Sequence, residues 1–229
     1  MKRTLALSIV AALVLLVVFS GCTGTAPAPQ PVATPAPVTT LATPAPTATP
    51  DPYPHALAPN VPISFGAGTK TGNMTAYGYT VRPTYSWVDP SWNSPREQGE
   101  ASKPLETQKG YNTKKPMDGN TFLFVYLNVA GTGTEAVYAP SPKQIVVVSD
   151  GKTYESSSLA TAQTIVDGEL GKQYDFQIGT GGTGGYILPG KSNTVKGFLI
   201  YEVPATFSPE KTYVIANPDA KTQGVWKLV

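Results

Sequence analysis

The chain has 229 residues, of which 41% are hydrophobic and 14% charged, and its formal net charge is +2. From residue 60 onward, 15 basic and 14 acidic residues nearly cancel, which argues against nucleic acid or an anionic membrane surface as a partner. A single cysteine excludes an internal disulfide, so the folded part must be stabilised by its core alone.

Residues 1–22 carry the features of a lipoprotein signal. A basic start precedes an almost unbroken apolar run over residues 5–19, and Ser20-Gly21 supplies small residues directly before Cys22. This order resembles a lipobox, in which the cysteine is lipidated and becomes the first residue of the mature chain. We therefore expect lipidation of Cys22 and an outward-facing, extracytoplasmic protein on the cell membrane. The alternative is an uncleaved N-terminal helix, since about 17 apolar residues are the lower limit for a membrane span.

Residues 23–59 are dominated by proline, alanine and threonine. Proline fixes its own φ and removes an amide donor, so this segment should sample polyproline II conformations without building a core. We predict a disordered linker that acts as a stalk. The only histidine, His55, lies in it. Residues 60–229 are then enough for one compact domain.

The polarity pattern of the domain is that of β-strands. Residues 75–81 alternate, which predicts a strand. One face of it would carry Tyr77, Tyr79 and Val81. Residues 121–129 are apolar on both faces of the predicted strand, so we expect a central strand that is buried on both sides.

Two further strands have clear boundaries. Residues 144–149 are followed by Asp150-Gly151, which is a strong signal for a tight hairpin turn. Residues 194–203 alternate and stop at Pro204, which cannot donate to a sheet. Short strands without alternating helices predict an all-β fold, an immunoglobulin-like antiparallel β-sandwich.

Several of these segments resemble a family of unknown function with a telokin-like immunoglobulin sandwich, found on bacterial and archaeal lipoproteins and secreted proteins. The segments that carry the resemblance are residues 122–131, 150–154, 188–190 and 197–204. The resemblance covers roughly residues 77–228 and consists of strand and turn patterns. It therefore implies the fold and says almost nothing about activity.

Residues 82–119 depart from that pattern and are the first candidate for a functional loop. The segment is polar but contains four aromatic residues that we select as a candidate binding loop: Tyr85, Trp87, Trp92 and Tyr111. Aromatic side chains on a polar loop can form a flat contact surface for an envelope glycan or a surface protein. The alternative is that the tryptophans fold inward and fix the loop to the sandwich.

One segment formally matches a phosphate-binding loop, with Gly185 and Gly190 at the glycine positions and Lys191-Ser192 after them. Such a loop needs a helix behind it, whereas an alternating strand follows here. We interpret Pro189-Gly190 as a turn and expect no nucleotide.

Catalysis and metal binding find little support in the sequence. His55 lies in the predicted linker, so the domain has no histidine to act as a general base, and no histidine or cysteine cluster for a transition metal. Asp167, Glu169 and Asp175 leave a calcium site as an alternative to solvated loop acids. We expect no catalytic residue, cofactor or metal. Asn73, followed by Met74-Thr75, matches the N-glycosylation acceptor pattern.

Two classes of function remain. The first is a non-catalytic binding or interaction module, anchored at the membrane and displayed on a stalk. The alternative is an inhibitor of secreted hydrolases, or an enzyme that acts on the cell envelope.

Overall fold

The computed structural model describes residues 50–89, 99, 102–157, 159, 165–166, 169–174, 185–190 and 194–229. These residues belong to one unit, residues 49–229. The strands are β1 (Ile63–Ala67), β2 (Lys70–Arg82), β3 (Tyr85–Val88), β4 (Tyr111–Lys114), β5 (Asn120–Gly131), β6 (Val137–Tyr138), β7 (Ile145–Ser149), β8 (Lys152–Tyr154), β9 (Ile165–Val166), β10 (Tyr186–Ile187), β11 (Thr194–Pro204), β12 (Thr212–Ala216) and β13 (Gly224–Lys227). Short 3-10 turns are η2 (Leu105–Thr107), η3 (Pro142–Gln144) and η4 (Pro209–Lys211).

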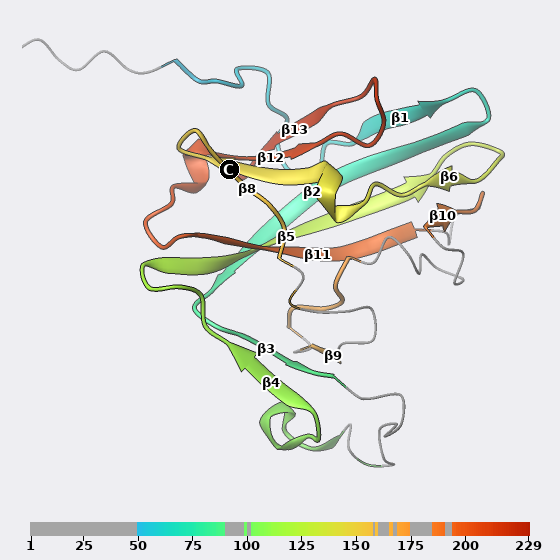
Figure 1. The fold of residues 1–229 in the computed structure, drawn as a ribbon. Coiled ribbons are helices and arrows are strands. Elements are labelled where there is room, and N and C mark those ends of the chain that lie inside the picture. Colours follow the sequence, from blue (N-terminus) through green and yellow to red (C-terminus); the bar gives the residue numbers. More distant parts are fainter. Residues whose placement is uncertain are drawn as a thin grey trace, which may run out of the picture. The chain divides into compact units, whose positions relative to one another are not determined.

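Two four-stranded antiparallel sheets form the sandwich (Figure 1). Their strand orders are β1-β2-β5-β11 and β13-β12-β7-β8. Two smaller sheets join β10 to β6 and β3 to both β4 and β9. The described ranges contain strands and 3-10 turns but no α-helix. The predicted all-β sandwich is therefore confirmed.

Strand β5 is central, as its sequence predicts, and it separates two apolar clusters. Leu123, Val125 and Leu127 face the second large sheet and are fully buried in the main core. Phe122 and Phe124 point to the opposite face, where they pack with residues of β11 and β3. Burial on both faces explains why this strand lacks the polar positions of a half-exposed one.

The predicted hairpin is also present. β7 and β8 pair in antiparallel fashion, and the turn residues Asp150 and Gly151 have φ angles of 47° and 75°. Positive φ at both positions is the requirement of a type I′ turn, which asparagine or aspartate followed by glycine meets best. Gly190 has φ 130°, in keeping with the predicted Pro189-Gly190 turn, and the next element is the strand β11.

The prediction that Tyr77, Tyr79 and Val81 share one face is wrong. The register of β2 against β5 shifts between Ala76 and Gly78, so Tyr77 is the extra residue of a β-bulge. Tyr79 packs against the main core, whereas the Tyr77 ring lies 5.7 Å from that of Tyr126 on the other face of the sheet. A bulge breaks the period of 2 because two residues on one strand oppose a single residue on its neighbour.

The free edge of β11 is covered by residues 170–174. Phe198 donates its backbone N–H to the Lys172 carbonyl at 3.0 Å, and its carbonyl accepts the Tyr174 N–H at 2.8 Å. Gly197 makes this approach possible, because a Cβ there would lie 2.5 Å from the Tyr174 nitrogen. The contact protects an edge that would otherwise expose unpaired backbone groups.

Gly197→Ala is therefore expected to destabilise the domain by about 1–3 kcal/mol, the usual cost of overpacking. The free energy of unfolding in urea measures it. Gly78→Ala is the matched control, since a Cβ at Gly78 meets no atom within 4 Å and its φ is not positive. An equal loss in the two variants would show that the approach of residues 170–174 is not the cause.

The segment that precedes residue 60 contacts the second large sheet. Leu57 donates its N–H to the Val225 carbonyl at 2.8 Å and accepts from the Lys227 N–H at 2.9 Å. The Tyr213 hydroxyl donates to the Asp51 carboxylate at 2.7 Å. Burial, assisted by Asp51, raises the pKa of Tyr213 to about 12. Part of the segment assigned to the linker thus packs on β12 and β13.

Candidate functional site

The aromatic residues selected from the sequence differ in burial. Tyr85 is fully buried, with its ring stacked 5.0 Å from Trp87 and tilted 5.6 Å from Phe124. Burial strongly raises its pKa, and its hydroxyl has no hydrogen-bond partner among the described residues. Tyr85 therefore belongs to the second apolar cluster and not to a contact surface.

Trp87 and Tyr111 lie on the small sheet that β3 forms with β4. Trp87 is half-buried, and the Tyr111 hydroxyl donates to the Ser86 Oγ at 3.1 Å. Trp92 lies outside the described residues, so three of the four aromatics are placed and two of them are partly accessible. Tyr85 is a buried anchor of this segment, and Trp87 packs against the same apolar cluster, in keeping with the inward-folding alternative for this tryptophan.

The remaining sequence candidates do not converge on one place. Cys22, Asp167 and Asp175 lie outside the described residues. The Glu169 carboxylate accepts from the Arg82 guanidinium at 2.8 Å. Within the ranges that the structure describes, no three His, Cys, Asp or Glu side chains are grouped as a metal site would require. Asn73 lies inside β2 between β1 and β5, where its Oδ1 accepts from the Ser64 hydroxyl at 2.9 Å.

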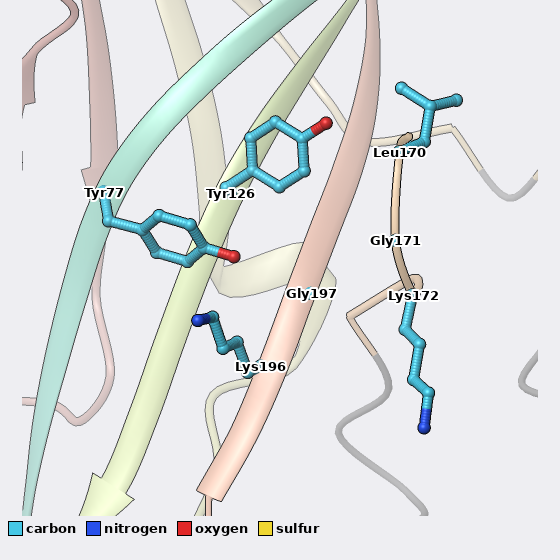
Figure 2. A pocket seen from close by; sticks show the side chains of 7 residues that line it. All are labelled: Tyr77, Tyr126, Leu170, Gly171, Lys172, Lys196 and Gly197. Atoms are coloured by element: carbon cyan, nitrogen blue, oxygen red, sulfur yellow. The ribbon is translucent and has the colours of Figure 1, made fainter. Parts of the chain in front are cut away.

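A cleft that the sequence did not predict lies on the outer face of the β2-β5-β11 sheet (Figure 2). Its volume is about 260 Å³. We call it the tyrosine–lysine cleft. It is lined by Tyr77 of β2, Tyr126 of β5, Lys196 and Gly197 of β11, and Leu170, Gly171 and Lys172 of the segment beside β11.

The chemistry of this cleft is aromatic and cationic. The Lys196 ammonium lies 4.9 Å from the centre of the Tyr77 ring, a cation–π distance. In Figure 2, Lys196 and the Tyr77 hydroxyl point into the same space, whereas Lys172 extends away from the rings. Burial, and to a lesser extent Tyr126, raises the pKa of Tyr77 above its ordinary value. The phenol is therefore a neutral hydrogen-bonding group at physiological pH.

Among the described residues, no acidic side chain neutralises the two lysines. The residues that line the cleft include no carboxylate. Neither Lys196 nor Lys172 forms an ion pair with any residue in the described part of the chain. Glu169, three residues before Lys172, is bound to Arg82. The cleft thus presents net positive charge beside two aromatic rings.

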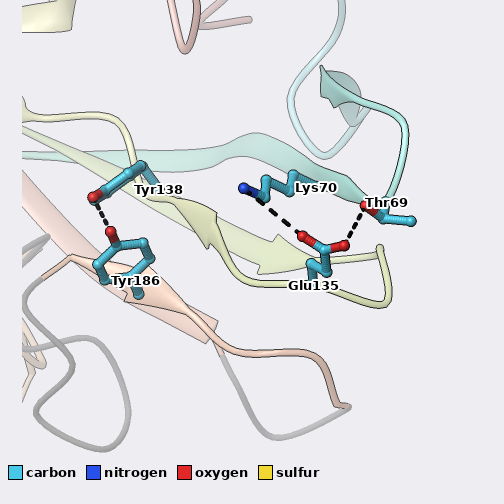
Figure 3. A network of polar contacts seen from close by, with 5 residues as sticks. All are labelled: Thr69, Lys70, Glu135, Tyr138 and Tyr186. Carbon is cyan, nitrogen blue, oxygen red and sulfur yellow. Dashed lines mark hydrogen bonds and ion pairs between the residues drawn. The ribbon is translucent and has the colours of Figure 1, made fainter.

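A second exposed aromatic pair lies on β6 and β10 (Figure 3). Tyr138 and Tyr186 are 59% and 39% exposed, and their ring centres are 4.0 Å apart. Their hydroxyls are hydrogen-bonded to each other. Close by, Glu135 binds Lys70 at 3.7 Å and accepts from Thr69 at 2.9 Å. The polar groups of this pair have partners already, so it has less to offer a ligand than the tyrosine–lysine cleft.

A larger cavity, of about 550 Å³, lies between residues 50–52 and the β7–β8 hairpin. Its lining includes charges of both signs, and Asp51 and Lys227 pair with each other at 3.5 Å. One wall consists of the segment that enters from the linker. This cavity is therefore a junction between linker and sandwich, and its three carboxylates and two lysines present no cationic site like that of the tyrosine–lysine cleft.

Comparisons with known proteins identify no family. No protein-family model matches the chain, and no curated protein matches it in sequence. The resemblance to the telokin-like family therefore stays a prediction. No helix in the described ranges is long and apolar enough to span a membrane.

Three of the solved structures to which this chain is similar come from Bacillus. A conserved hypothetical protein from Bacillus anthracis is 16% identical, with a TM-score of 0.42, over 74% of this chain and 95% of that chain. The yjhA protein from Bacillus subtilis is 10% identical, with a TM-score of 0.40, over 72% of this chain and 95% of that one. A third, from Bacillus subtilis, is described as "a putative lipoprotein (ycdA)" and is 10% identical, with a TM-score of 0.35, over 68% of this chain and 35% of that chain.

Sequence reasoning missed the cleft for a physical reason. Tyr77 reaches the outer face only because of the bulge, and a bulge leaves no clear mark in the polarity pattern. Tyr126 and Lys196 were more accessible to prediction. Both occupy positions that point away from the main core, and the antiparallel pairing of β5 with β11 brings them together.

Proposed function

We propose that this protein is an outward-facing binding module, held at the membrane by lipid on Cys22, whose ligand site is the tyrosine–lysine cleft. The observation that carries the proposal is the pair of half-buried tyrosine rings beside a lysine that has no acidic partner among the described residues. All of these groups stand on the rigid strands β2, β5 and β11. Sites on strands hold their geometry better than sites on loops.

The order of the chain supports a display function. A signal segment that ends at Cys22 comes first, a proline-rich linker follows, and the sandwich comes last. A semi-rigid linker of this composition keeps a domain away from the surface to which it is anchored. The outer face of the β2-β5-β11 sheet would then be presented to other components of the envelope.

Binding is favoured over catalysis by the composition of the cleft. Its lining holds tyrosine, lysine, leucine and glycine, and the described residues around it place no histidine or carboxylate there. Tyrosine and lysine can act in acid–base catalysis, but they usually do so with a partner that shifts the proton equilibrium toward neutral pH. Burial raises the pKa of Tyr77, which moves this group away from that range.

Tyr77→Ala is expected to weaken the retention of the protein on isolated cell envelopes by about tenfold or more, because a tyrosine buried by its ligand is a typical hot spot. A co-sedimentation assay with increasing amounts of envelope gives the apparent Kd. Tyr138→Ala is the matched control, since Tyr138 is a surface tyrosine that lies outside the cleft. Equal retention of wild type and Tyr77→Ala, with both folded by circular dichroism, would place the binding surface elsewhere.

A further inference from the structure

We infer that the tyrosine–lysine cleft binds an acidic saccharide, with the sugar ring against the tyrosines and its carboxylate or phosphate at Lys196. The inference rests on the proposed function, because it names the class of ligand for the same site. It depends on three features of the cleft: its two rings, its uncompensated charge and its size.

The rings supply an apolar platform of limited area. Tyr77 and Tyr126 lie 5.7 Å apart with 37° between their planes, so they form a shallow, angled surface and not a parallel slot. A parallel slot would suit a flat nucleobase, which stacks on both sides. An angled pair suits the C–H face of a puckered sugar ring, while the tyrosine hydroxyls remain able to bond to sugar hydroxyls.

The charge selects an anion. The Lys196 ammonium lies over the Tyr77 ring, 4.9 Å from its centre, and Lys172 stands on the opposite side of β11. Neither lysine is paired with an acid in the described ranges, so a ligand anion would form the first charge-assisted hydrogen bonds at this site. A lysine ammonium acts as a point charge and lacks the planar, two-pronged donor geometry of arginine. It can therefore donate to a carboxylate or to a phosphate.

The size of the cleft fits a saccharide unit better than a folded partner. Its volume of about 260 Å³ lies just under the roughly 300–1,000 Å³ of pockets for drug-sized ligands. The cleft reaches across the sheet face from Tyr77 of β2 to the segment at residues 170–172. A volume of this size corresponds to about one sugar unit.

The test is titration calorimetry of the detergent-solubilised mature protein with defined saccharides. The probes are an oligogalacturonate, its fully methyl-esterified form, and a phosphorylated mannose oligosaccharide. We expect the oligogalacturonate to bind about tenfold or more tightly than its neutral ester, which corresponds to about 1.4 kcal/mol. Binding should weaken as salt rises, because the charged contact is exposed. The phosphorylated probe shows which anion is preferred.

The variants separate charge from platform. Lys196→Gln should weaken the binding of the acidic probe by about tenfold and leave the neutral ester unchanged. Lys152→Gln is the matched control, because Lys152 is an exposed lysine on β8 in the other large sheet. Tyr77→Ala should weaken both probes, since it removes part of the platform.

Two failures can be told apart. If the ester binds as well as the acid, the saccharide ligand need not be acidic and the inference is wrong. If no saccharide binds while Tyr77→Ala still reduces envelope retention, the inference is also wrong, but the proposed binding function is supported. If neither saccharides nor envelopes distinguish Tyr77→Ala from wild type, the proposed function fails as well. Tighter binding of a single-stranded oligonucleotide than of the acidic saccharide would also overturn the inference.

Discussion

Cys22→Ala is expected to abolish lipid anchoring of the protein. Lipidation requires the thiol, and the peptidase that cleaves before a lipidated cysteine should then leave the signal segment in place or release a differently processed species. We therefore expect an unmodified chain with a larger polypeptide mass, or a protein that moves to the soluble extracytoplasmic fraction. Membrane fractionation combined with mass spectrometry of the intact protein distinguishes these products from the lipidated form.

The control for this experiment is Ser20→Ala, which keeps a small residue ahead of Cys22 and should leave processing unchanged. The competing interpretation makes a different prediction. If residues 5–19 stay as an uncleaved helix, Cys22→Ala would remain in the membrane fraction at the mass of its unprocessed chain, and so would the wild type. That result would refute the lipobox interpretation while leaving the sandwich and its cleft untouched.

The parts of the fold that the sequence predicted are those in which local chemistry and tertiary structure agree. The Asp150-Gly151 turn needs positive φ at both residues, and these two residue types tolerate it, so the hairpin is specified locally. Strand β5 carries apolar residues on both faces because it is central and covered on both. Pro204 ends β11, as a residue without an amide donor should.

The parts that could not be predicted depend on pairing between distant segments. The bulge at Tyr77 results from how β2 aligns with β5, and no residue near it is specific to a bulge. Tyr85 stands in a polar segment, yet it fills a space left by Phe124 and Phe198. Gly197 gave no sign that another segment would approach it. The cleft could not be predicted from the sequence for the same reason, because it needs both the bulge and the covered edge of β11.

Trp226→Ala is expected to cause the largest loss of stability of any single substitution considered. Trp226 is only 1% exposed, belongs to the main core, and donates its indole N–H to the Val61 carbonyl at 2.7 Å. Truncating a buried tryptophan typically costs about 3–5 kcal/mol. Because a domain is stable by only about 5–15 kcal/mol, the midpoint of urea unfolding should fall steeply.

The same residue connects the sandwich to the segment that leads in from the linker. Leu57 forms a parallel β-bridge with Trp226 of β13. Ile63 of β1 lies beside Gly224, which is also on β13. Loss of the ring should therefore loosen residues 57–63 as well as the core, which amide hydrogen exchange at these positions would detect. Removal of residues 1–59 should reproduce the loosening of β13 without the full loss of core packing.

Two further variants assign the cause. Trp226→Phe keeps most of the apolar volume but leaves the Val61 carbonyl without its donor, so it should cost about 1–3 kcal/mol. Trp87→Ala removes a half-buried tryptophan from β3 and should cost less than Trp226→Ala, because its ring covers only one side of Tyr85. If Trp87→Ala proved the more damaging, the small sheet of β3 and β4 would be the structural centre of the domain, and the two large sheets would depend on it.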